Sequence, residues 1–315
     1  MSVAPCGFSP MQIVYLTDTT SYILDNLCCQ LFFAVLYAKI ALCRRHGIMK
    51  VILSRKGMDS ASGGMANPIL SDGTLLSLPI PDKTTKTTYN DLFYKEQSLK
   101  EIISQLCPKF DFGKNQTCHL DPDIYKNIED RTANTEWKPA FGQHGISAAH
   151  LDKLSVGVGD IFLFYGMFKK TMVQPDKTLC FVRNAPIIHI IYGYMKIGEI
   201  LSEEQEIKSR YFWHPHSVNS DRLNNRLYLP DTYGTFQYND SLVLTKRGQD
   251  NRRLWALPAF FGEDGISISW QGANRPIRKN GYAELNSACR GQEFVVTAST
   301  LKQERNLCDW VDRLI

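Results

Sequence analysis

Short apolar runs separated by turn residues dominate the chain from Lys50 onward, and they indicate a β-rich fold. A buried strand is typically a short, continuous apolar run that is rich in β-branched and aromatic residues and bounded by turn signals. Runs of this kind occur at residues 50–54, 161–165, 185–200, 242–245, 266–270 and 293–297. They outnumber the helical patterns, so the sequence predicts an α+β fold with a β-rich mixed core and a few helices.

One amphipathic helix is predicted at residues 90–106. Asn90 or Asp91 can cap its amino end, and its apolar residues recur on one face. The helix should end at Cys107, because the residue before a proline avoids the helical region. Upstream, the dipeptide Asp72-Gly73 predicts a hairpin turn between residues 69–70 and 75–76.

Composition limits the class of protein. The 315 residues are 43% hydrophobic and 22% charged, which is typical of a globular protein with a sizeable core. The net charge of +4 is well short of a surface dedicated to coating nucleic acid. Nine cysteines are scattered without a CxxC pair, which argues against a disulfide framework and against a thiolate zinc site. We therefore expect a reducing compartment, the cytoplasm.

Residues 1–48 differ from the rest of the chain. They hold four of the nine cysteines, and residues 27–38 are almost entirely apolar. This run is shorter than the about 20 residues that cross a membrane, and no basic segment precedes it as in a signal peptide, so no stable membrane insertion is expected. The segment is a docked helix, a membrane-surface anchor, or an upstream extension that the native protein lacks. Met49 precedes a strand-like run as a natural start would, which favours the extension and a domain spanning residues 49–315.

The loop SRKGMDSASGG, residues 54–64, follows the first predicted strand. Its glycine-rich backbone can form an anion nest, to which cationic side chains and hydroxyls add donors for phosphate. It is not a P-loop, because the lysine precedes the glycines, and it is not GxGxxG. A flexible connection between strands is the alternative. The candidate ligand-binding residues are Ser54, Arg55, Lys56, Ser60, Gly63 and Gly64, and Asp59 is a catalytic candidate.

The motif HLDPD places His119, Asp121 and Asp123 at alternate positions. On an extended chain such residues point to the same side, where an imidazole and a carboxylate can share a proton or hold a divalent cation. We expect His119 and Asp121 to be catalytic. Asp123 fits turn chemistry or the cap of a helix starting at Ile124 instead.

Two further regions carry candidate ligand-binding residues. In WHPHS, His214 and His216 flank a stiff proline, and with a carboxylate they can hold a metal ion; the alternative is a loop with one buried and one exposed histidine. Trp213 can stack on a base or belong to the core. The amide of Gln143 can read a base edge because it offers both a donor and an acceptor. His150 is a further polar candidate. Arg290, Gln292 and Glu293 in CRGQEF are of similar kind, with turns or structural ion pairs as their alternative.

Seven blocks together resemble the Nmad3 family, the nucleotide modification associated domain 3. In chain order they are MKVILSRKGMDSASGG, PILSDGTLLSLPIPD, CHLDPD, FGQHG, GVGDIFLFYGMF, YFWHPH and RGQEF, and they run from Met49 to Phe294. The resemblance implies an association with nucleotide or DNA-base modification, but it assigns no reaction and no catalytic residue. Asn67, which precedes Pro68, is a small departure from the family pattern.

A shorter pattern resembles PUA-like barrels of the EVE and ASCH types. It consists of HLDKLSVGVGDIFLFYG followed by HIIYGYMKIGEI, in which a Gly-Asp turn opens a barrel strand. The resemblance implies a cleft that holds a modified base or RNA.

Three hypotheses for function follow. The chain is an enzyme of nucleotide or base modification with a phosphate-binding pocket, a non-catalytic module that recognises a modified base or nucleic acid through a PUA-like barrel, or a structural protein. The partner expected under the first two is a nucleotide or nucleic acid. The sequence contains no motif for a methyl donor, flavin or nicotinamide, so it assigns no cofactor, and it assigns neither a metal nor an oligomeric state.

Overall fold

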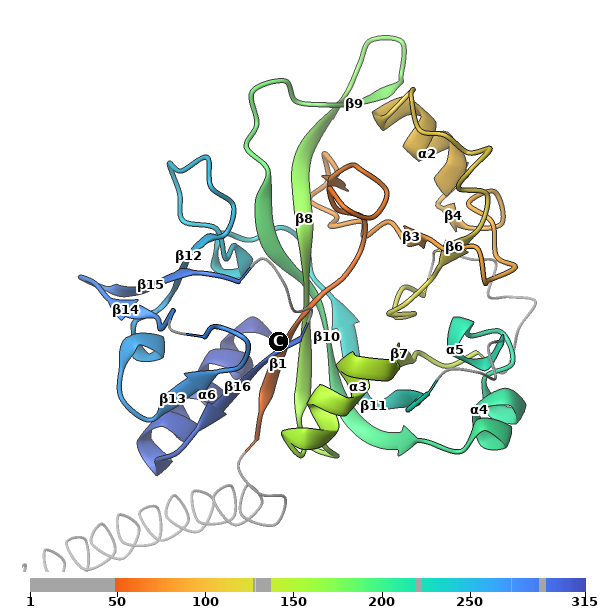
Figure 1. Ribbon diagram of the computed structural model, residues 1–315. Helices are drawn as coiled ribbons and strands as arrows, with labels where there is room; N and C mark the ends of the chain where they lie inside the picture. The colour runs from red at the N-terminus through yellow and green to blue at the C-terminus, as the bar shows by residue number, and fades with distance from the viewer. Residues whose placement is uncertain (1–48, 127, 129–136, 219–222, 273, 289–292) are drawn as a thin grey trace, which may run out of the picture. The chain divides into compact units, whose positions relative to one another are not determined.

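The computed structural model describes residues 49–126, 128, 137–218, 223–272, 274–288 and 293–315. Their fold is α+β, as predicted: a sheet of nine strands curls into a half-barrel, and short helices pack around it (Figure 1). The sheet follows the order β13 (Ile266–Ile268), β16 (Glu293–Ala298), β1 (Val51–Arg55), β8 (Ile161–Val173), β10 (Ile188–Leu201), β11 (Arg226–Thr235) and β7 (Phe141–Gln143), and both β2 (Asn67–Ile69) and β9 (Leu179–Phe181) pair with β8.

Smaller elements surround this sheet. A three-stranded sheet consists of β12 (Leu254–Pro258), β15 (Tyr282–Asn286) and β14 (Ile277–Arg278), and two strand pairs join β3 (Ile80–Pro81) to β6 (Cys118–His119) and β4 (Phe93–Tyr94) to β5 (Gln97–Ser98). The helices are α2 (Leu99–Leu106), α3 (Gly145–Lys153), α4 (Glu204–Arg210), α5 (Pro215–Val218) and α6 (Leu301–Leu314), with 3₁₀ turns η2 (Asp240–Leu242) and η3 (Ala259–Gly262).

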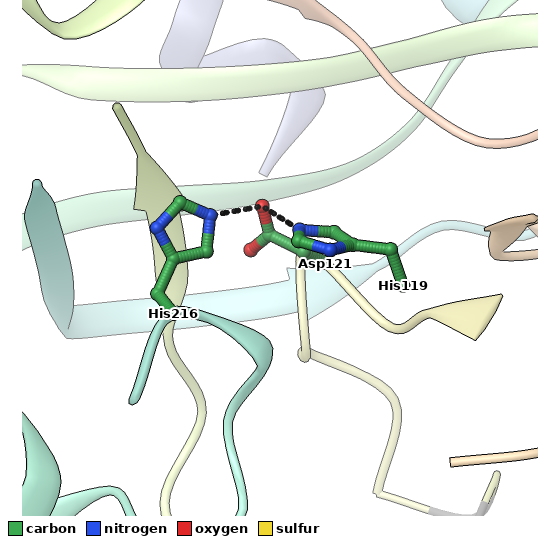
Figure 2. A group of neighbouring side chains, drawn as sticks. All are labelled: His119, Asp121 and His216. Atoms are coloured by element: carbon green, nitrogen blue, oxygen red, sulfur yellow. Dashed lines mark ion pairs between the residues drawn. The ribbon is translucent and has the colours of Figure 1, made fainter. Parts of the chain in front are cut away.

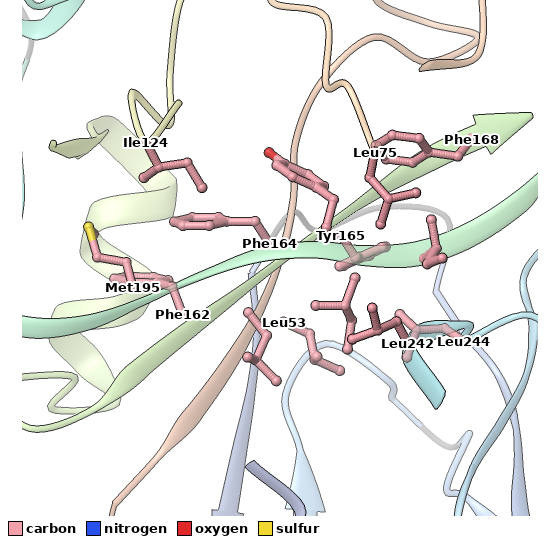
Figure 3. Close-up of a cluster of buried hydrophobic side chains, with 14 of the residues drawn as sticks. Leu53, Leu75, Ile124, Phe162, Phe164, Tyr165, Phe168, Met195, Leu242 and Leu244 are labelled. Carbon is pink, nitrogen blue, oxygen red and sulfur yellow. The ribbon is translucent and has the colours of Figure 1, made fainter. Parts of the chain in front are cut away.

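Strand β1 lies at the centre of the sheet, parallel to β8 and antiparallel to β16. Its continuous apolar run is explained by burial on both faces, since Val51, Ile52 and Leu53 are fully buried. Figure 3 shows Leu53 in this core together with Phe164 and Tyr165 of β8. The strand predicted at residues 50–54 is therefore confirmed.

The curl of the sheet comes from the long strand β10. Its register with β8 shifts between Ile191 and Gly193, and its register with β11 shifts around Ile197. Such bulges bend a strand and increase its twist. The predicted Gly-Asp turn is present just before β8, where the carboxylate of Asp160 accepts the amide hydrogens of Lys50 and Gly157.

The predicted helix is shorter than expected, and the prediction was wrong for residues 90–98. Ser98 caps the helix and forms a capping box with Glu101, so α2 begins at Leu99. The preceding residues form the β4–β5 pair instead, and Lys95 has a φ of 55°, which a helix does not permit. The carboxyl end at Cys107 agrees with the prediction. The Asp72-Gly73 turn is also present, with Ile69 bridged to Leu75.

Two other local predictions were wrong. Residues 242–245 do not form a strand, because Leu242 ends η2 and Val243 and Thr245 make only isolated bridges. Asp123 does not cap a helix, because its backbone bridges Ala140 and its carboxylate accepts a hydrogen bond from the indole of Trp137 at 2.9 Å.

Asn67, the departure from the family pattern, links three separate segments. The residue is fully buried, and its side-chain oxygen accepts the amide hydrogen of Leu78 at 2.8 Å. Its side-chain nitrogen donates to the carbonyl oxygens of Met58 at 3.0 Å and Met167 at 2.9 Å. These bonds hold the loop after β1 against β8, and they satisfy backbone groups of buried residues.

Replacing Asn67 with alanine should lower the free energy of unfolding by about 3 kcal/mol, because three buried backbone groups lose their partner. Urea unfolding followed by circular dichroism measures this change. The control is Asn184→Ala at an exposed position, which should change stability by less than about 0.5 kcal/mol. Equal effects of the two substitutions would contradict the role given to Asn67.

Candidate functional site

A cavity of about 560 Å³ lies where the loop after β1 meets β3, β6, β7 and α5. Segments far apart in the sequence contribute to it. Its lining consists of Arg55, Lys56, Gly57, Asp59, Ser62, Ile80, Pro81, Asp82, Thr84, His119, Asp121, Gly142, Gln143, His144 and His216. Seven of the residues predicted from the sequence are among them: Arg55, Lys56, Asp59, His119, Asp121, Gln143 and His216.

His119, Asp121 and His216 form a compact cluster on one side of this cavity (Figure 2). One possible ligand atom from each residue lies within 4.8 Å of the others. The Nε2 atom of His119 is 3.6 Å from Oδ2 of Asp121, and the Nε2 atom of His216 is 3.7 Å from the same oxygen. The two imidazoles therefore face one carboxylate from different elements, β6 and α5.

Hydrogen bonds on the far side of each ring determine which nitrogen carries the proton. Nδ1 of His119 is 2.8 Å from Oδ2 of Asp82. Nδ1 of His216 is 2.7 Å from Oδ1 of Asn225, whose amide nitrogen donates to the His216 carbonyl oxygen at 3.0 Å. Both acceptors require a proton on Nδ1, so each neutral ring presents the lone pair of Nε2 to Asp121.

His214 approaches Asp121 in the opposite state. Its Nδ1 accepts the backbone amide hydrogen of His216 at 3.2 Å, which leaves the proton on Nε2. That Nε2 lies 3.5 Å from Oδ1 of Asp121, and within the described residues it has no hydrogen-bond partner. The side chain is fully buried. His214 therefore lies behind the carboxylate and does not line the cavity.

The carboxylate of Asp121 is itself held in place. Its side chain is only 5% exposed, and Oδ1 accepts the amide hydrogen of Gly142 at 2.8 Å. Burial acts to raise the pKa of Asp121, but the imidazoles of His119 and His214 outweigh it and hold this pKa well below its usual range. Burial also lowers the pKa of His216 well below the ordinary value. The group is therefore a buried anion surrounded by imidazoles.

Gly142 is required by the position of His216. A Cβ atom added at residue 142 would overlap the His216 ring. The absence of a side chain in this strand lets the imidazole lie against the backbone of β7 while the Gly142 amide binds Asp121. Strand glycines often mark such a close approach.

A second buried carboxylate holds two further lining residues of the cavity, Lys56 and Gln143. Glu293 is 1% exposed, and its Oε1 accepts hydrogen bonds from Lys56 at 3.0 Å and from the Gln143 amide nitrogen at 2.6 Å. Ser54 also donates to it at 3.4 Å. The ammonium group of Lys56 lies over the ring of Phe141 as well. Lys56 is thus a paired structural cation, and the amide nitrogen of Gln143 is held by the same carboxylate.

The loop after β1 is shaped by Asp59. Its Oδ1 accepts the amide hydrogens of Ala61 at 2.7 Å and Ser62 at 2.8 Å. These amides therefore bind the chain's own carboxylate and do not form the predicted anion nest. Oδ2 of Asp59 is 3.8 Å from Nε of Arg55, whose side chain is about one quarter exposed. A catalytic role for Asp59 stays a prediction.

Several predicted residues lie away from the cavity lining. Ser54 is behind it, and exposed Ser60 accepts a hydrogen bond from Arg252 at 3.2 Å. Gly63 and Gly64 turn the loop with φ of 88° and 73°. His150 bonds Ser269 at 3.0 Å and contacts Trp270, while Trp213 packs on a small apolar cluster with Tyr211. Arg290 and Gln292 lie outside the described residues.

Sequence reasoning missed Asp82, Gly142 and Asn225. Glu293 was among the polar candidates of CRGQEF, and it forms the structural ion pair with Lys56 that was the alternative reading. Asp82 ends the block PILSDGTLLSLPIPD, which gives no sign of its role. Asp82 meets His119 because β3 pairs with β6, with Ile80 opposite His119. A pairing of that kind is set by tertiary structure and leaves no local signal.

No helix among the described residues is long and apolar enough to cross a membrane.

Comparison with known proteins gives one family. The family model described as nucleotide modification associated domain 3, Nmad3, matches residues 50–297. No curated protein and no solved structure matches the chain.

Gly142→Ala should destabilise the protein by about 1–3 kcal/mol, since the new methyl group overlaps the His216 ring. In a His216→Ala background the same substitution should cost much less, because the ring is gone. A double-mutant cycle from urea unfolding measures this coupling. Additive effects of the two substitutions would show that the close packing of ring and glycine has been misjudged.

Proposed function

The chain belongs to the nucleotide modification associated domain 3 family, and on that premise we propose that its cavity binds a nucleotide by its phosphate and base. The family name associates the chain with nucleotide modification. The observation that carries the proposal is the meeting of Arg55, Gln143 and the His119–Asp121 pair in one cavity. A volume of about 560 Å³ lies within the range of small-molecule sites, about 300–1,000 Å³.

Arg55 is the proposed phosphate ligand. Lys56 is already bonded to Glu293, and the Ala61 and Ser62 amides are bonded to Asp59. Among the described residues, the ion pair of Arg55 is a long one with Asp59, at 3.8 Å. A guanidinium group can bind a phosphate through two parallel hydrogen bonds. The phosphate would therefore bind at the mouth of the loop and not within it.

Gln143 is the proposed contact to the base. Its amide nitrogen donates to buried Glu293 at 2.6 Å, which fixes the orientation of the amide. The side-chain oxygen is then an acceptor suited to an amino or imino hydrogen of a base. A fixed acceptor discriminates between bases better than a freely rotating amide, because the wrong base leaves it unpaired.

The proposed reaction centre is the pair His119 and Asp121, which borders the same cavity. The alternative is a module that binds a modified base or nucleic acid without acting on it, through a PUA-like barrel. The two proposals differ in one outcome. Incubation of the full chain with candidate nucleotides, followed by chromatography, yields an altered nucleotide only if the chain is an enzyme, and His119→Gln should then abolish the product.

Arg55→Gln should weaken nucleotide binding about 10- to 100-fold, which corresponds to the loss of a charge-assisted hydrogen bond. Isothermal titration with nucleoside mono-, di- and triphosphates, with and without a divalent cation, measures the affinity. The matched control is Arg305→Gln, which removes the same charge from an exposed position on α6 and should leave the affinity unchanged.

The parent nucleosides should bind more weakly than their phosphates in the native chain. Equal affinity for nucleosides and nucleotides, or equal losses in the two arginine variants, would rule out Arg55 as a phosphate ligand.

A further inference from the structure

We propose that His119, Asp121 and His216 bind one divalent first-row transition-metal ion of the zinc or iron(II) type. This inference rests on the side-chain cluster itself and is independent of nucleotide binding. Figure 2 shows the two rings converging on the carboxylate of Asp121.

The first argument concerns protons. Asp82 and Asn225 hold the Nδ1–H groups of the two rings, so both Nε2 atoms present lone pairs. They face Oδ2 of Asp121, which is also an acceptor, at 3.6 and 3.7 Å. When both rings are neutral, three acceptors point at one another in a partly buried site, and they repel unless a proton or a metal cation lies between them. A metal ion provides that cation without disturbing either Nδ1 bond.

The second argument concerns distances. Ligand atoms 2.0–2.2 Å from a tetrahedral ion lie about 3.3 Å from one another. The observed separations from Asp121 are slightly longer than this value and are well beyond the 2.7–3.0 Å typical of a charge-assisted hydrogen bond. The cluster therefore has room for an ion after a small inward movement of the rings.

The third argument concerns the groups around the ligands. Histidines that bind metals usually donate their other ring nitrogen to an oxygen acceptor, and both rings do so here. The ligand carboxylate is also oriented, because its Oδ1 accepts the amide hydrogen of Gly142 at 2.8 Å, and the Nε2 of buried His214 lies 3.5 Å from the same oxygen. Within the described part of the chain, the buried Nε2 of His214 has no hydrogen-bond partner, and the charged group that lies beside it is this carboxylate. This independent observation indicates that the surrounding groups are arranged around the negative charge of Asp121.

The donor set selects the class of ion. Two imidazole nitrogens and one carboxylate oxygen suit zinc, iron and related ions, whereas magnesium and calcium prefer sites made of oxygen alone. All three ligands line the cavity, so the remaining coordination positions of the ion face its interior. A site with three protein ligands and an open position is the arrangement found in catalytic centres.

The test measures metal in the full chain, purified without a polyhistidine tag and without chelator. Mass spectrometry of the metal content should find about one transition-metal ion per chain. After chelation, titration with Zn²⁺ or Co²⁺ alone should restore one equivalent, and Mg²⁺ should not compete. Co²⁺ should give visible absorption bands typical of nitrogen and oxygen coordination.

Variants locate the ion. His119→Gln and His216→Gln should each weaken Zn²⁺ binding at least 100-fold, while His150→Gln, which removes a histidine outside the cavity, should bind as the native chain does. Asp82→Asn should weaken binding about 10- to 100-fold and shift the Co²⁺ spectrum, as expected for a positioning residue. Thermal unfolding of each metal-free variant checks that it folds.

His216 is buried and its variant can fail to fold, in which case His119→Gln decides, because that side chain is 13% exposed at the cavity. Native protein that takes up no stoichiometric Zn²⁺, Co²⁺, Mn²⁺ or Fe²⁺ would overturn the proposal. Binding that His119→Gln leaves intact would overturn it equally. No nucleotide is present in these measurements, so a failure of nucleotide binding does not affect their outcome.

Discussion

The negative charge of Asp121 is the constraint on which the cavity depends. A carboxylate that is 5% exposed loses most of its hydration, and it stays ionised only if hydrogen bonds and positive or polar groups replace the lost water. These groups come from three different places: the Gly142 amide in β7, His119 in β6, and His214 just before α5. The three elements must therefore meet at one point, and the cavity is the space between them and the β1 loop.

Glu293 is a second buried carboxylate that needs partners to replace its lost hydration. It begins β16, and its partners Ser54, Lys56 and Gln143 belong to β1, the following loop and β7. Removing one partner of such a buried pair leaves an uncompensated charge, which is strongly destabilising. The two buried carboxylates thus connect strands β1, β16 and β7 to a single cavity. The side chains at its surface are oriented by bonds made beneath it.

The sequence predicted those parts of the site that local spacing controls. His119 and Asp121 were expected to share one side of an extended segment, and both line the cavity. The partners Asp82 and Asn225 could not be found in this way, because each is brought in by strand pairing or by the turn of the chain after α5. The helix predicted for residues 90–98 was wrong for a different reason. The capping box at Ser98 starts the helix at Leu99, although the apolar periodicity continues upstream of it.

The charges around the cavity connect its two proposed ligands. Asp59 offsets Arg55 and Glu293 offsets Lys56, and the buried carboxylate of Asp121 adds a negative charge to the lining. A phosphate entering such a cavity alone would be repelled by this carboxylate. A divalent ion bound at Asp121 would balance its charge and present open coordination positions to the anion. Metal and nucleotide should therefore bind with positive coupling, each raising the affinity of the other by the same factor.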